Sequence, residues 1–111
     1  MAAGTYNFTL EQGATFNRIL TLQENSSAMN LTGYSVASKF RSTHDSSTVV
    51  GTFTCTISDA ANGKITMSMT NSTTSAVEEG IYVYDLEITS GAGAVTRVLQ
   101  GNITVTPEVT R

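Results

Sequence analysis

The single histidine lies in a polar segment that contains the residue types of a hydrolytic triad. His44 and Asp45 are followed directly by Ser46 and Ser47. In Ser-His-Asp catalysis the imidazole takes a proton from the hydroxyl while the carboxylate orients the imidazole. Adjacent loop residues rarely point at one another, and no nucleophile elbow or oxyanion loop is recognisable. We therefore expect an exposed polar loop and no catalytic residue.

The single cysteine and two of the methionines are candidates for reactive or binding side chains. Cys55 would be a nucleophile only if a basic neighbour ionised its thiol. It alternates with Phe53 and Ile57, so we expect a small buried hydrophobic residue. Met67 and Met69 are spaced for one face of a strand, where methionine more often fills a core than forms a binding patch.

Acidic residues are the candidates for calcium binding or for paired-carboxylate catalysis: Glu78, Glu79, Asp85, Glu87 and Glu108. Asp85 and Glu87 share one strand face, with side chains about 7 Å apart. Calcium needs six to eight oxygen ligands, and no D-x-D-x-D-G loop is present. One cysteine and one histidine supply neither a thiolate zinc cage nor a multi-histidine site. We expect a solvated sheet face, no metal and no cofactor.

Charge and hydropathy exclude further classes. Nine acidic and six basic residues give a net charge of −3, which argues against phosphate neutralisation and hence against a nucleic-acid partner. There is no run of 18 apolar residues, and Met1–Leu10 lacks the features of a secretory signal. We expect no membrane association. With 40% hydrophobic residues in 111, the chain should fold as one domain, residues 1–111.

Alternation of apolar and polar residues predicts the elements that must position these side chains. Seven strands are expected, at residues 5–12, 15–22, 34–41, 49–57, 65–69, 81–89 and 95–105. The strand at 81–89 is apolar on both faces, which is typical of a central strand. Glu24–Asn30 reads as a turn, and Asn62–Gly63 favours a type I′ hairpin.

One short helix is expected at Asn71–Gly80, with Asn71 or Ser72 as the N-cap and Gly80 at the C′ position. Ala76 and Val77 would pack on one side of it. In the last strand Gly101 suggests a bulge or twist point, and Pro107 ends the strand.

Seven short strands with turns every 8 to 12 residues or so favour an all-β fold: a two-sheet antiparallel immunoglobulin-like sandwich with one short helix. A closed barrel is the alternative. The cysteine pair and tryptophan of antibody domains are missing, so that likeness is architectural only.

Five segments in order carry a family resemblance: Gly13–Phe16 leading into Arg18–Leu20; Asn30–Tyr34; Gly63–Ser68; Gly80–Leu86; and Val98–Gly101 with Ile103, Val105, Pro107, Glu108 and Val109. Together they resemble the N-terminal domain of phage baseplate upper proteins. The resemblance implies a non-enzymatic virion protein, made in the host cytoplasm, that binds other virion proteins in symmetric multiple copies. It implies no catalytic, cofactor-binding or metal-binding residue.

Baseplate upper proteins continue past this domain into further regions. A domain of this kind that stands alone could instead serve as a decoration or connector protein. We expect a place in the baseplate, tail or tail fibre, with the first or last strand as the contact edge. One alternative is a capsid decoration (cement) protein, which copy number would distinguish. Another is a carbohydrate-binding, adhesin-like module, although the tyrosines fall at expected core positions rather than on a sugar platform.

Overall fold

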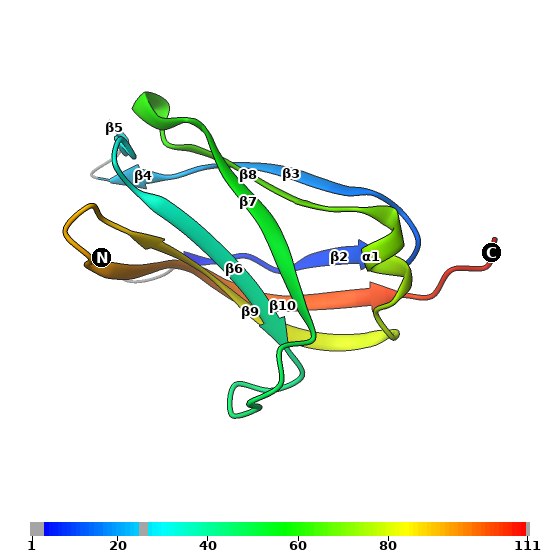
Figure 1. Ribbon diagram of the computed structural model, residues 1–111. Helices are drawn as coiled ribbons and strands as arrows, with labels where there is room; N and C mark the ends of the chain where they lie inside the picture. The colour runs from blue at the N-terminus through cyan, green and yellow to red at the C-terminus, as the bar shows by residue number, and fades with distance from the viewer. Residues whose placement is uncertain (1–3, 25–26, 111) are drawn as a thin grey trace.

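The chain folds into one long sheet that curls over itself, as the computed structural model in Figure 1 shows. The structure describes residues 4–24 and 27–110. The strands of this sheet are β1 (Gly4–Thr5), β2 (Phe8–Glu11), β3 (Phe16–Thr21), β6 (Ser35–Arg41), β7 (Gly51–Asp59), β8 (Lys64–Met69), β9 (Gly80–Thr89) and β10 (Val95–Thr106). Their spatial order is β1-β10-β9-β6-β7-β8-β3, with β2 also paired to β10. The all-β prediction is confirmed.

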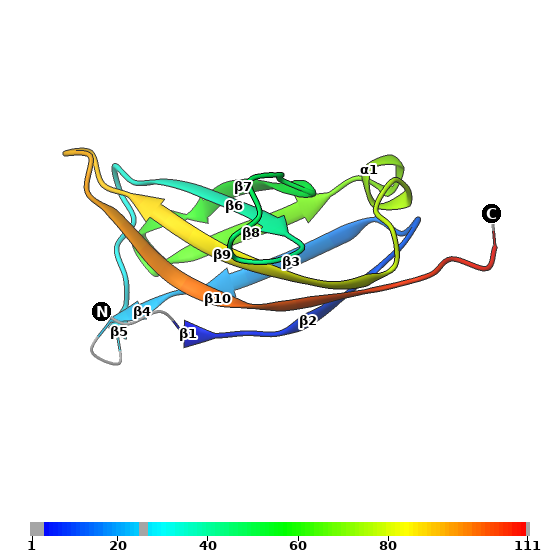
Figure 2. The ribbon, with the colours of Figure 1, turned by 90° about the horizontal axis from the view of Figure 1, so that it is seen from below.

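Strand β7 carries the sheet from one arm of the curl to the other. Its first residues pair with β6, as in Phe53 opposite Ser38, and from Thr54 onward it pairs with β8. We call β1, β2, β10, β9 and β6 the β9 arm, and β3, β8 and β7 from Thr54 onward the β8 arm. The two arms overlap in the view of Figure 2. Among the described residues no pairing joins β2 to β3, so the curl is not a closed barrel.

The sheet is mixed, because both N-terminal strands run parallel to β10. The prediction of antiparallel pairing throughout is therefore wrong. The expected strand 5–12 is also broken in two, since the backbone N–H of Tyr6 donates to the Gln100 carbonyl and the Asn7 side chain accepts from the Asn102 N–H. As a result β10 is an interior strand from Leu99 to Thr106, so most of the last strand is not a free edge. The sheet edges are β1–β2 and β3.

The core fills the space between the arms, and alternation predicted its members well. Tyr82, Tyr84, Leu86 and Ile88 of β9 are buried, as are Met67 and Met69 of β8. Phe8 of the β9 arm stacks on Phe16 of the β8 arm at a centroid distance of 5.2 Å, and it lies 5.9 Å from Phe53, where β7 passes between the arms.

The central position of β9 is confirmed, since it lies between β10 and β6. The expected burial of both faces of β9 is wrong. No layer of the described residues covers the outer face of this arm, and Ile81 is 68% exposed there.

The connection between β7 and β8 differs from the expected type I′ turn. A register shift between Ile57 and Asp59 lengthens the connection, which forms the 3-10 helix η1 (Ala60–Asn62). Only Gly63 is left-handed, with φ 68°. Leu22 and Met29 carbonyls crowd the position that a Cβ at Gly63 would take, so glycine is required there.

Other boundaries differ by a few residues. Strand β7 begins at Gly51 rather than Val49. The expected turn at 24–30 contains a two-stranded hairpin, β4 (Gln23–Glu24) and β5 (Ser27–Ala28); residues 25–26 lie outside the described residues. The bulge in β10 falls between Arg97 and Leu99 rather than at Gly101. Strand β10 ends just before Pro107, as expected.

The short helix is present as α1 (Asn71–Ser75), but its cap and its packing differ. Thr70 is the N-cap, because its hydroxyl accepts the Thr73 N–H, and Gly80 belongs to β9. The buried residues are Thr74 and Val77, while Ala76 is exposed. The Thr74 hydroxyl accepts the Gly13 N–H and donates to the Ala14 carbonyl, so α1 is fastened to the turn between β2 and β3.

Candidate functional site

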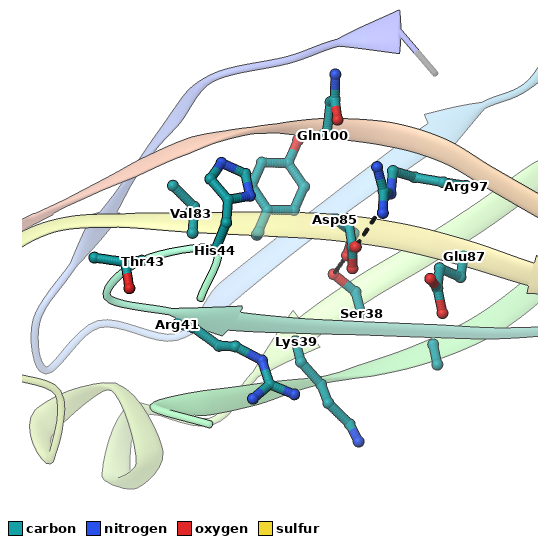
Figure 3. A pocket seen from close by; sticks show the side chains of 12 residues that line it. Ser38, Lys39, Arg41, Thr43, His44, Val83, Asp85, Glu87, Arg97 and Gln100 are labelled. Atoms are coloured by element: carbon teal, nitrogen blue, oxygen red, sulfur yellow. Dashed lines mark hydrogen bonds and ion pairs between the residues drawn. The ribbon is translucent and has the colours of Figure 1, made fainter. Parts of the chain in front are cut away.

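The outer face of the β9 arm holds a hollow of about 410 Å³ (Figure 3). Strands β6, β9 and β10 form its floor, and the loop that contains Thr43 and His44 forms part of its rim. Because the inward-facing residues of these strands build the core, the alternate residues point into the hollow. Rigid central strands therefore position its side chains.

Charged residues in the hollow alternate in sign across the three strands. Lys39 of β6 lies opposite Asp85 of β9, and Arg97 of β10 lies opposite Glu87 of β9. Opposite charges in facing positions stabilise a sheet. Arg97 Nε also lies 3.3 Å from Asp85 Oδ2, with both side chains partly exposed. Such a pair typically contributes about 0.2–1 kcal/mol, so it orients the two side chains more than it holds the fold.

Half of the chain's six basic residues lie on this face: Lys39, Arg41 and Arg97. Against Asp85 and Glu87 they leave one positive charge locally, on a chain whose net charge is −3. Arg41 has a structural contact as well, because its guanidinium donates to the Ser46 carbonyl at 2.9 Å and holds the loop over the hollow. The face can thus form ion pairs and hydrogen bonds with another surface of mixed charge.

The triad-like segment in this loop has no catalytic arrangement in the structure. His44 and Asp45 are exposed. The Ser46 hydroxyl contacts the backbone of Thr48, accepting its N–H at 3.2 Å, rather than the imidazole. The loop is polar and largely exposed, as expected.

Cys55 is half-buried in β7 and packs against the core. Burial raises the pKa of its thiol to about 11, since desolvation disfavours the thiolate. A protonated thiol is a poor nucleophile and a poor metal ligand. This environment fits the expected role of Cys55 as a small hydrophobic residue, although its side chain is less buried than we expected.

The acidic residues lie in two separate places. Asp85 and Glu87 belong to the hollow, whereas Glu78, Glu79 and Glu108 surround a second depression at the α1 end, together with Gln12, Ser75 and Pro107. Within residues 4–24 and 27–110, no three Asp, Glu, His or Cys side chains are grouped so that they could hold a metal ion.

Two of the four tyrosine hydroxyls, those of Tyr82 and Tyr84, bind backbone carbonyls inside the fold. Tyr82 donates to the Glu78 carbonyl at 2.7 Å, and Tyr84 donates to the Tyr6 carbonyl at 2.6 Å. Burial raises the pKa of both phenols, with a further contribution from Glu78 for Tyr82. Both rings are buried, so neither offers an exposed platform for a sugar.

The sequence alone did not reveal the charged rows. It predicted that Asp85 and Glu87 share one strand face, but the register between strands was needed to bring Lys39 and Arg97 beside them. Among the described residues, no helix is long and apolar enough to cross a membrane. Comparison with protein-family models finds no match, and neither does a search of curated proteins.

Proposed function

We propose that the curled sheet is an immunoglobulin-like sandwich. The β8 arm has the order β3-β8-β7 and the β9 arm the order β6-β9-β10, which correspond to strands B-E-D and C-F-G of that fold. The Tyr82 hydroxyl, near the start of the F-like strand, bonds to a carbonyl four residues upstream, as in a tyrosine corner. The N-terminal strands depart from the constant-type layout by pairing with β10.

We further propose that the chain is a non-enzymatic structural domain of a tailed-phage virion, in the baseplate, tail or tail fibre, and that it acts by protein–protein assembly. The resemblance to baseplate upper proteins supports this through residues that build the fold. Leu31 is fully buried and its N–H donates to the Ala60 carbonyl, while Gly63 makes the left-handed turn into β8.

The observation that carries the assembly proposal is the difference between the two outer faces. The face of the β9 arm has charged rows and a hollow. The outward residues of the β8 arm are almost all uncharged, and the two charged ones, Lys64 and Asp59, lie opposite each other on β8 and β7. The uncharged outward residues are Asn17, Ile19, Thr21, Thr54, Thr56, Ser58, Thr66 and Ser68. Two faces of different chemistry on one small domain suit contacts with two different neighbours.

Mass spectrometry of purified phage particles tests the proposal. The protein should be present in particles in a few to tens of copies, as tail symmetry requires. Hundreds of copies would favour the alternative of a capsid decoration protein. Presence in the lysate but absence from purified particles would contradict both.

A further inference from the structure

Strand β3 is an edge of the sheet and is open to strand addition. Its one strand partner among the described residues is β8. The Leu22 N–H, just after β3, donates to the Gly63 carbonyl on the β8 side. Since N–H and C=O groups alternate in direction along an antiparallel strand, those of Asn17, Ile19 and Thr21 point to the open side.

Two of the features that commonly protect a sheet edge, proline and a bulge, are missing from β3. Edges are usually blunted by proline, by bulges, or by charged side chains, including ones that point inward. Strand β3 has no proline, pairs with β8 in an unbroken register over Phe16–Thr21, and exposes 64% of Ile19. The opposite edge consists of the two short pieces β1 and β2. Of the two edges, β3 is the one suited to a longer partner strand.

The only charge on β3 lies on the core side, at the gap between β3 and β2. The Arg18 guanidinium lies 5.5 Å from the Phe16 ring centroid and 6.0 Å from that of Phe8 on β2. Its Nε is buried and has no hydrogen-bond partner among the residues that the structure describes. A buried donor without an acceptor is costly, so a carboxylate on the core side of an added strand would complement Arg18 in both charge and hydrogen bonding.

We propose that the β3 edge binds an extended segment of a partner protein, which adds as a strand and places a carboxylate opposite Arg18 and an apolar side chain opposite Ile19. Backbone groups of Asn17, Ile19 and Thr21 would supply the affinity, and Arg18 would select the acidic residue. This proposal names a binding surface for the assembly function proposed above. It rests on that function only in assigning the bound segment to another virion protein.

A synthetic heptapeptide, Thr-Val-Ile-Glu-Thr-Val-Thr, is a direct probe. In antiparallel register its glutamate lies opposite Arg18 and its isoleucine opposite Ile19. Fluorescence anisotropy of the labelled peptide with the full chain should show saturable binding, and replacing its glutamate by lysine should weaken binding at least about tenfold. No binding of the glutamate peptide at about 1 mM, or equal binding of both peptides, would overturn the proposal.

Two matched variants locate the binding surface. Ile19→Lys puts a charge on the open edge, whereas Ile81→Lys changes a similarly exposed isoleucine, 68% against 64%, on β9. Ile19→Lys should raise the dissociation constant at least about tenfold and Ile81→Lys should leave it unchanged. Equal effects would contradict binding at β3.

Amide exchange in the unmutated chain gives a readout that does not depend on a variant folding. Peptide addition should slow exchange at Asn17, Ile19 and Thr21; no slowing would overturn the proposal.

Sedimentation of the chain alone tests whether a second copy of this chain occupies the β3 edge instead. A dimer that Ile19→Lys disperses would assign the edge to that second copy. If the peptide binds but the protein is absent from virions, the virion function is refuted and the proposed binding at β3 stands. If the protein is present in virions but the peptide does not bind, only the proposed binding at β3 is refuted.

Discussion

The Tyr82 hydroxyl links the start of β9 to the segment that follows α1. Its O–H donates to the Glu78 carbonyl at 2.7 Å, in a part of the chain without regular structure. Tyr82→Phe should lower the free energy of unfolding by about 1 kcal/mol, the usual net value of one hydrogen bond. Urea denaturation measures this. Tyr34→Phe is the control, because Tyr34 is half-buried and its hydroxyl has no partner among the described residues; equal losses would contradict the assigned role.

Cys55 should be slow to react in the folded chain. With its pKa raised from 9.0 to about 11, the thiolate fraction at pH 8 falls about 100-fold. Reaction with a disulfide reagent at pH 8 should be at least about tenfold slower in buffer than in concentrated urea. Equal rates would show an exposed thiol. Because folding favours the protonated thiol, its contribution to stability is complete below pH 9 and is lost as the pH rises towards 11.

Alternation predicted the direction of single side chains, because an inward or outward position depends only on local strand geometry. Met67, Met69 and the tyrosines of β9 were placed in the core on that basis. The pairing of Lys39 with Asp85 was not predictable, since these residues are 46 positions apart and meet only through the register of β6 on β9. The exposure of Ile81 was missed because the absence of a covering layer is a tertiary property.

At the scale of elements, Gly101 governs how the N-terminal strands dock on β10. A Cβ there would overlap the Tyr6 carbonyl and crowd the Asn7 side chain. Gly101→Ala should therefore cost about 1–3 kcal/mol, as overpacking does, and should raise amide exchange in β1 and β2. Thermal unfolding with exchange mass spectrometry checks both effects.

Gly91→Ala is the control for this substitution. Its Cβ would meet only the Gly33 carbonyl, at 3.6 Å, an ordinary contact. It should change stability by less than about 0.5 kcal/mol. If Gly101→Ala is equally harmless, the close approach of Tyr6 and Asn7 to β10 is wrong.

Most strands were predictable from period-2 patterns, but several connections were not. The parallel pairing of β1 and β2 with β10 joins the two ends of the described chain, which local patterns cannot encode. The split role of β7 depends on where the sheet curls. Asn62–Gly63 was misread as a two-residue turn because the register shift at Asp59, which makes room for η1, leaves no local signal.

At the scale of the whole molecule, the two lysines of the chain serve as separate probes of the two faces. Lys39 lies in the charged hollow of the β9 arm, and Lys64 lies on the outer, largely uncharged face of the β8 arm. Both are exposed. An amine-reactive cross-linker applied to intact particles therefore reports the neighbour of each face independently.

Cross-linking mass spectrometry of purified virions tests the assembly role most directly. We predict cross-links from Lys39 and from Lys64 to virion proteins, with different neighbours on the two faces. Absence of the chain from the particles, or its presence with neither lysine linked to any virion protein, would contradict the account.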